Sequence, residues 1–140
     1  MLQKSKHFYL VKIIKRLSEL NATRLAVFWT IAITVASLVS VDNFPKASVP
    51  GNDKIVHFIF YFIVTLLWHL AIQPNHNTLI TKLIVFVIVV IYGIIIEILQ
   101  GALTTYRQAD FYDVLANAAG ASIATFVMIW LNYKTLQKKF

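Results

Sequence analysis

Ionisable and hydrogen-bonding side chains occur in three short runs of this sequence, each beside a long apolar segment. In the first run, Asp53, His57 and Tyr61 follow one another at intervals of four, so one helix face would carry all three. Carboxylate, imidazole and phenol groups on one face can bind a polar ligand, hold a cation or move protons. The neighbouring Lys54 adds an ammonium group that can meet phosphate or carboxylate. This run predicts a polar face at the beginning of an apolar helix.

The second run lies at the end of another apolar segment. Gly93, Glu97 and Gln100 follow the four-then-three spacing of one helix face. Glu97 is surrounded in sequence by isoleucines, where an isolated carboxylate would lose its hydration. We therefore expect Glu97 either to have a cationic or hydrogen-bonding partner or to hold a proton.

The third run precedes and enters a last apolar segment. Asp110, Asp113 and Asn117 again share one helix face. Arg107, just before them, is suited to phosphate because its planar guanidinium group offers paired donors. Further along, Ala116, Gly120 and Ala124 form a small-residue ridge that would let this helix pack closely on another.

The composition indicates that these runs are held by membrane helices. Hydrophobic residues make up 59% of the 140 residues and charged residues 14%, where a soluble domain has about 25%. Four segments, at about 25–41, 55–72, 79–99 and 114–131, are apolar and near the roughly 17–25 residues that cross a hydrocarbon core. The sequence predicts a single all-α domain over 1–140, an integral membrane bundle of four transmembrane helices.

Residues 1–24 form a basic segment before the first span. Its apolar residues recur at helical spacing while Lys, Arg and Glu take the other positions, which predicts an amphipathic interfacial helix. The helix would serve either as a topology anchor or as a docking surface for anionic lipid. The apolar positions are Leu10, Val11, Ile13, Ile14, Leu17 and Leu20.

The distribution of basic residues predicts the orientation. Lys and Arg number 13 against six Asp and Glu, and most of them flank the predicted inner ends of the spans. Only Lys46, Lys54 and Arg107 fall in the connections 42–54 and 100–112. Cytoplasmic flanks collect Lys and Arg, so both termini are predicted to be cytoplasmic and these two connections to face outward. The same distribution argues against a nucleic-acid partner, and the absence of cysteine excludes disulfides and thiolate metal sites.

The acidic residues gather at the predicted outer side of the membrane. Five of the six fall in the outward connections or at the adjoining helix ends; these are Asp42, Asp53, Glu97, Asp110 and Asp113. Charged groups at membrane depth normally face a bundle interior, a partner or a wet cavity, so their co-location predicts one shared polar pocket.

Binding of a lipid headgroup or a cell-envelope intermediate is the function we expect of such a pocket. Lys54 and Arg107 would hold phosphate or carboxylate, while Glu97, Asp113 and His57 would bond hydroxyls or move protons. No cofactor is predicted, although the carboxylates could also hold a hard divalent cation such as calcium or magnesium. Membrane lipids are the expected partners.

Three other interpretations stay open. The predicted pocket has the side chains that an enzyme would need, with His57 or Glu97 as general base. The sequence, however, has no Ser-His-Asp order, phosphate loop or His-Glu-x-x-His motif, so it favours a binding protein. A non-catalytic accessory subunit of a larger envelope complex is an alternative. The polar residues could also be structural. Asp110 or Asp113 could cap the fourth helix, and Asn52 or Asp53 the second. Arg107 could form a bridge to Glu97 or Asp113.

The three runs together resemble the VanZ-like family of bacterial membrane proteins. The resemblance is carried by Asp53-Lys54-x-x-His57-Phe58 with Tyr61, by Glu97-x-x-Gln100, and by Arg107 followed by Asp113-x-x-x-Asn117 with Gly120. It covers about residues 52–124. It implies a multi-pass protein of the bacterial cytoplasmic membrane and a link to low-level resistance to the glycopeptide teicoplanin.

Overall fold

The protein folds into four helices in the part of the chain that the structure describes. This computed structural model describes residues 2–38, 52–72, 78–103 and 109–137. They contain α1 (Leu2–Leu38), α2 (Asn52–Ile72), α3 (Leu79–Leu103) and α4 (Phe111–Gln137), and no strand is found among them. The prediction of an all-α fold is confirmed.

Each helix contains a segment that is long and apolar enough to cross a membrane. These segments are Leu20–Leu38, Asp53–Ile72, Leu79–Leu103 and Phe111–Tyr133. They agree with the four predicted spans. The last three reach further because the polar residues at the span ends are also helical, and the first begins earlier, at Leu20, while residues 39–41 of the predicted span lie outside the described residues. The chain is therefore a multi-pass membrane protein.

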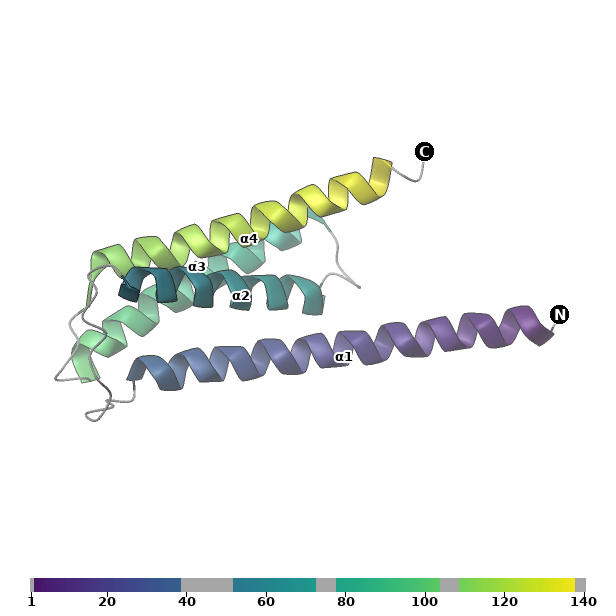
Figure 1. Ribbon diagram of the computed structural model, residues 1–140, viewed down its shortest axis with the longest axis horizontal. Coiled ribbons are helices and arrows are strands. Elements are labelled where there is room, and N and C mark those ends of the chain that lie inside the picture. Colours follow the sequence, from purple (N-terminus) through teal and green to yellow (C-terminus); the bar gives the residue numbers. More distant parts are fainter. Residues whose placement is uncertain (1, 39–51, 73–77, 104–108, 138–140) are drawn as a thin grey trace.

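α1 is one continuous helix that includes the predicted basic segment. Its 37 residues extend for roughly 55 Å at 1.5 Å per residue, well beyond the hydrocarbon core of about 30 Å. Figure 1 shows the N-terminal half of α1 projecting past the other three helices. The basic segment thus prolongs the first span without a break.

α2 is the central helix of the bundle. It packs against α4 on one side and α1 on the other, and its most extensive contact is with α4 (Figure 1). The contact with α4 is close because Gly120 has no side chain: a Cβ atom there would overlap the carbonyl oxygen of Phe58 and lie 3.0 Å from the Phe62 backbone nitrogen. The predicted small-residue ridge on α4 is therefore an α2–α4 contact, in which Ala124 is also fully buried.

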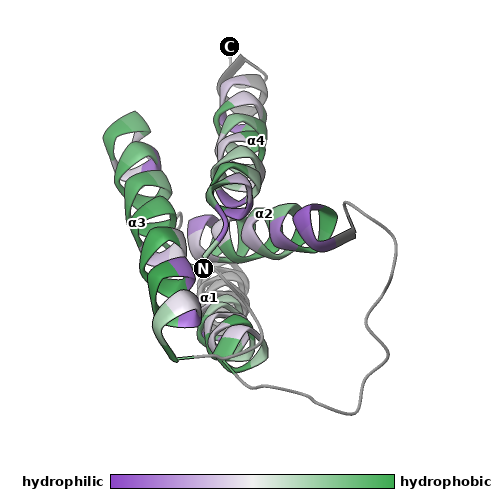
Figure 2. Cartoon of the chain, turned by 90° about the vertical axis from the view of Figure 1, so that its left-hand side faces the viewer, coloured by the Kyte–Doolittle hydropathy of each residue, from purple (hydrophilic) through white to green (hydrophobic). Residues whose placement is uncertain are grey.

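α3 presents a long apolar surface outward. Aliphatic side chains along one side are exposed, as expected of a helix that faces lipid, among them Ile84, Ile88, Ile91, Ile95 and Ile98. Its opposite side carries the buried Val85, Val89, Gly93 and Glu97. In Figure 2 α3 is mainly hydrophobic, whereas α2 and α4 begin with hydrophilic residues.

α1 is joined to its neighbours by a stripe of hydroxyl groups. The Trp68 indole donates a hydrogen bond to Thr30 Oγ1 at 3.1 Å, and the Tyr92 hydroxyl donates to the Thr30 carbonyl at 3.0 Å. Thr34 Oγ1 lies 2.8 Å from the same Tyr92 hydroxyl. These bonds connect α1 to α2 and α3, so the stripe serves helix packing.

One end of the bundle, which we call the site end, contains the last turns of α1 and α3 and the first turns of α2 and α4 (Figure 1). The first turn of α1 and the last turn of α4 lie at the opposite end. Because the chain crosses the bundle four times, the start of α1 and the end of α4 both lie opposite the site end. The three polar runs of the sequence all lie at the site end.

Candidate functional site

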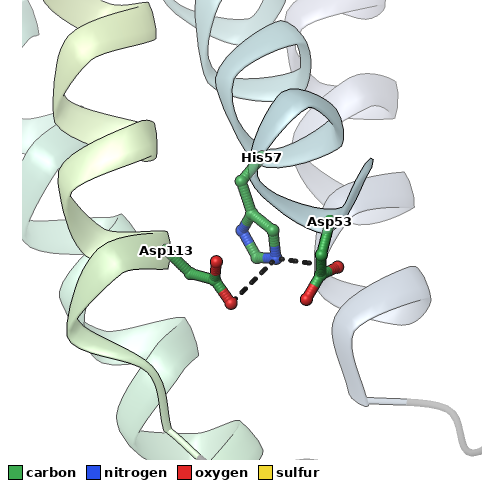
Figure 3. A group of neighbouring side chains, drawn as sticks. All are labelled: Asp53, His57 and Asp113. Carbon is green, nitrogen blue, oxygen red and sulfur yellow. Dashed lines mark ion pairs between the residues drawn. The ribbon is translucent and has the colours of Figure 1, made fainter. Parts of the chain in front are cut away.

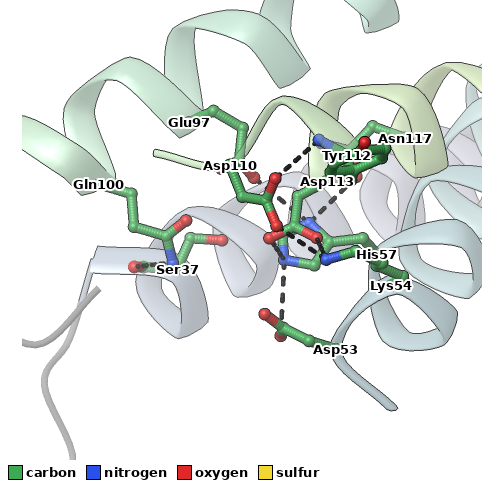
Figure 4. A network of polar contacts seen from close by, with 10 residues as sticks. All are labelled: Ser37, Asp53, Lys54, His57, Glu97, Gln100, Asp110, Tyr112, Asp113 and Asn117. Atoms are coloured by element: carbon green, nitrogen blue, oxygen red, sulfur yellow. Dashed lines mark hydrogen bonds and ion pairs between the residues drawn. The ribbon is translucent and has the colours of Figure 1, made fainter. Parts of the chain in front are cut away.

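A network of polar side chains from three helices occupies the site end (Figure 4). We call it the polar cluster. α2 contributes three of its members, α3 one, and α4 with the residue before it three; they are Asp53, Lys54, His57, Glu97, Asp110, Asp113 and Asn117. All seven were predicted as site residues, and the structure brings them together.

Lys54 is the cation on the outer side of the cluster. Its Nζ lies 2.8 Å from Asp110 Oδ2 and 3.2 Å from Asp113 Oδ1, and it lies 5.8 Å from the centre of the Tyr112 ring. The charge of Lys54 is therefore shared between two carboxylates. Tyr112 was not predicted as a site residue, because its contact with Lys54 depends on how α2 and α4 pack.

Asp110 has a second role as the cap of α4. Its Oδ1 accepts a hydrogen bond from the Tyr112 backbone N–H at 2.8 Å, and its carbonyl accepts one from the Asp113 N–H at 3.1 Å. The hydrogen bond from Lys54, and then the one from the Tyr112 N–H, lower the pKa of Asp110 below its usual value. One of the structural interpretations, Asp110 as an N-cap, is thus confirmed.

His57 lies at the centre of the cluster, with acidic or amide groups on both sides of its ring. Nδ1 is 3.1 Å from Asn117 Oδ1 and 3.4 Å from Glu97 Oε1. Nε2 is 3.8 Å from Asp53 Oδ1 and also 3.8 Å from Asp113 Oδ2 (Figure 3). If Nδ1 carries the proton, it can donate to the Asn117 and Glu97 side-chain oxygens. Nε2 can then accept a hydrogen bond or bind a metal ion.

Two buried members of the polar cluster, and the predicted site residue Tyr61 beside them, have polar atoms without a hydrogen bond among the described residues. They are the Tyr61 hydroxyl, both carboxyl oxygens of Glu97 and the Asn117 amide nitrogen. The side chains are almost completely buried, with exposures of 1%, 2% and 1%. The His57 ring and the Asp110 backbone N–H lie near Glu97, but neither makes a hydrogen bond of acceptable geometry with its carboxyl group. Buried polar groups in native proteins are nearly always satisfied, so a water molecule, ion or ligand is expected here.

Gly93 lets these groups approach one another. A Cβ atom at Gly93 would lie 2.9 Å from a ring carbon of Tyr61 and 3.4 Å from the Cβ atom of Asn117. Glu97 follows Gly93 by one turn on the same buried side of α3. The small residue thus brings α3 against the face of α2 and α4 that carries the unsatisfied groups.

Apart from Tyr61, two predicted site residues are not members of the polar cluster. The Gln100 amide donates a hydrogen bond to the Ser37 carbonyl at 3.2 Å, which connects α3 with α1 at the edge of the cluster (Figure 4). Arg107 lies outside the described residues. The bridge from Arg107 to Glu97, one of the structural interpretations, lies outside them too.

The arrangement is acidic overall. Four carboxyl groups (Asp53, Glu97, Asp110 and Asp113) meet one ammonium group and one imidazole among the described residues. Such a cluster can accept hydrogen bonds from hydroxyl or amine groups, hold a cation or relay a proton through His57. A free anion would find the nearest cation already paired.

The sequence is similar to a known protein family and to a protein of known sequence. The family model described as VanZ/LLP1 matches residues 5–132. An uncharacterized protein of Schizosaccharomyces pombe is 33% identical over 114 residues, which cover 81% of this chain and 67% of the yeast protein. No solved structure matches.

The family match includes all three polar runs and all four spans, and it agrees with the resemblance that the motifs indicate. The chain belongs to the VanZ/LLP1 family.

Proposed function

We propose that this protein binds the polar headgroup of a membrane lipid, or of a lipid-linked cell-envelope intermediate, at the polar cluster. The cluster lies at one end of a bundle whose outer surfaces are apolar, which is the depth at which lipid headgroups meet hydrocarbon. A headgroup could enter there while its chains stay along the exposed aliphatic side of α3.

The observation that carries the proposal is the set of unsatisfied buried groups. Tyr61, Glu97 and Asn117 come from three different helices and offer a hydroxyl, a carboxyl group and an amide N–H to the same region. Leaving such a group unpaired costs about 1–3 kcal/mol, so a ligand that bonded all three would gain affinity from them.

The charges favour the hydroxyl or amine part of the headgroup over its phosphate as the group that enters. Lys54 was predicted to hold phosphate, but it is already bonded to Asp110 and Asp113. Sugar hydroxyls or an amine can donate to Glu97 and Asp53, whereas a phosphate would be repelled by them. The phosphate would then remain outside the polar cluster.

Mass spectrometry of the lipids that copurify with the protein tests the proposal. We expect one headgroup class to be enriched over bulk membrane in the wild type and to be lost in Glu97→Gln. Thr125→Val is the matched control, because it changes a buried polar residue of α4 far from the cluster and should retain the lipid. Absence of any enriched lipid in the wild type would refute headgroup binding. A protein that copurifies equally with wild type and Glu97→Gln would instead favour an accessory subunit.

A link to glycopeptide resistance belongs to the same proposal. If the headgroup is that of a cell-wall intermediate, expression in a teicoplanin-sensitive bacterium should raise the inhibitory concentration. Glu97→Gln, expressed to the same level, should not. Equal protection by both proteins would separate resistance from the polar cluster.

The proposal includes a bacterial cytoplasmic membrane with both termini in the cytoplasm. The charge distribution supports this orientation, because the connections at the site end carry three of the 13 basic residues. Cysteines introduced at Ala47 and Asn75 test it with an impermeant thiol reagent applied from outside. Labelling at Ala47 alone is expected, and labelling at Asn75 alone would reverse the orientation.

A further inference from the structure

We propose that Asp53, His57 and Asp113 form a binding site for a first-row divalent metal ion such as Zn²⁺ or Mn²⁺. One ligand atom of each residue lies within 4.8 Å of the others, and the three side chains point toward a common region between α2 and α4 (Figure 3). Asp53 and His57 lie one turn apart on α2, and Asp113 faces them from the first turn of α4.

The distances fit an ion better than a direct hydrogen bond. A charged imidazole that donated to the carboxylates would lie about 2.7–2.9 Å from them. Both N–O distances are instead 3.8 Å. Donor atoms around a tetrahedral ion, each about 2.1 Å from the metal, are separated by roughly 3.4 Å, so a small rotation of the half-exposed Asp53 would complete the geometry.

Glu97 provides the second, independent observation. Its buried carboxyl group has no hydrogen bond among the described residues, and it lies 3.4 Å from His57 Nδ1, the ring nitrogen opposite the proposed ion. Histidines that ligate metals almost always donate their other ring N–H to a carboxylate or carbonyl. Glu97, together with the Asn117 oxygen at 3.1 Å, would thus hold the tautomer that leaves Nε2 free for the metal.

The excess of carboxyl groups in the polar cluster also favours binding of a cation. The carboxylates of the polar cluster outnumber the Lys54 ammonium group, and two of them, Glu97 and Asp113, are buried. Lys54 occupies Oδ1 of Asp113 and leaves Oδ2 directed toward His57. A divalent ion would offset the remaining negative charge at a depth where few water molecules are available to do so.

The donor set selects the class of ion. Calcium and magnesium prefer oxygen ligands, so the carboxylates alone left either ion open in the sequence, but imidazole suits zinc and other first-row metals. One nitrogen and two carboxylates leave at least one coordination position open. Because the Asp53 side chain is 55% exposed, that position faces the outside of the bundle, and the ion could exchange with solution.

The inference goes beyond headgroup binding, since all three ligands belong to the protein. Metal analysis of the full-length protein in detergent tests it with the metal alone. After dialysis against Zn²⁺ or Mn²⁺, we expect one tightly held ion per chain in the wild type, and affinity at least about tenfold weaker in Asp53→Asn. Glu97→Gln should weaken binding by roughly 10–100-fold through the orientation of His57.

The two buried histidines of α2 supply the matched pair of variants. His57→Gln should abolish binding, whereas His69→Gln, at the other end of the same helix, should retain it. No ion in the wild type, or equal loss in both histidine variants, would overturn the site. Should His57→Gln or Asp53→Asn fail to fold, the visible absorption of the Co²⁺-loaded wild type decides, because a spectrum identical to free Co²⁺ would also overturn it.

Discussion

His57 and His69 occupy comparable positions at opposite ends of α2. They are 12 residues apart on the same helix, and each bonds a residue of α4: His57 bonds Asn117 at 3.1 Å, and His69 bonds Thr125 at 3.0 Å. Both histidines are buried. The surroundings differ, because carboxylates lie within 3.8 Å of both nitrogens of His57, whereas the charged group near His69 is Lys82.

The comparison separates structure from function within one pair of helices. A histidine bond between α2 and α4 occurs at both ends, so this bond alone is explained by helix packing. The site end adds carboxylates and unsatisfied buried groups, which packing does not require. We therefore place the function in the acidic residues around His57.

The largest effect on stability is expected at Gly120, where one α2–α4 contact supports the surroundings of both His57 and His69. Gly120 lies between Asn117 and Thr125 on α4, and Gly120→Val would drive its side chain into the Phe58 backbone. We expect a loss of about 3 kcal/mol in the free energy of unfolding, measured by SDS titration in mixed micelles, and loss of lipid and metal binding together. Ala119→Val, on the exposed side of the same turn, is the control and should fold normally. A stable Gly120→Val protein would show that the two ends are not held by this contact.

Glu97→Gln should affect the site end alone. The variant removes a buried charge but keeps the shape of the side chain, so binding should weaken by roughly 10–100-fold while stability is unchanged or improved. An unpaired buried carboxylate costs free energy, and an amide costs less. Parallel measurements of metal affinity and of unfolding check this. A variant that unfolds easily yet still binds would make Glu97 a structural residue.

Thr125→Val should have the opposite pattern. It removes the hydroxyl that pairs with His69, so the free energy of unfolding should fall by about 1 kcal/mol, and binding at the site end should persist. Ser122→Ala is the control, because that hydroxyl bonds only the Ala118 carbonyl of its own helix and is exposed. Equal stability of the two variants would mean that the His69 pair contributes little to packing.

The helices and their polar faces could be predicted from the sequence because both depend on local spacing. Apolar runs of membrane-spanning length fix the spans, and a helix period brings Asp53 and His57 to one face without knowledge of the partner helices. Glu97 among isoleucines predicted a buried carboxylate in need of a partner. The structure confirms its burial, with His57 Nδ1 at 3.4 Å from its carboxyl group.

The pairing across helices could not be predicted in the same way. From the sequence alone, Lys54 could equally have pointed toward a ligand. Its ion pairs with Asp110 and Asp113 depend on the distance between α2 and α4, which the close contact at Gly120 determines. Gln100 shares a helix face with Glu97, yet its bond to Ser37 requires the position of α1. Spacing gives the face of a residue, and only the packing gives its partner.

Asp110→Asn should produce the smallest effect at the site end. Asn is also a good N-cap, so the variant keeps the cap of α4 and loses only the charge that meets Lys54, and Asp110→Ala, which loses the cap as well, should be less stable. The pair is solvent-exposed on both sides, so its contribution is modest and should diminish in high salt.

The pH dependence gives this last prediction its sign. Because the folded state lowers the pKa of Asp110, the ion pair stabilises the protein above the unfolded-state pKa of about 3.9, and this stabilisation is lost as pH falls through the lower folded-state value. Wild type should therefore exceed Asp110→Asn in stability at pH 7, and the two curves should converge in acid. Unfolding measured from pH 7 to 3 at low and high salt checks this. A difference that persisted in acid would assign the effect of Asp110 to the cap of α4 instead of its bond with Lys54.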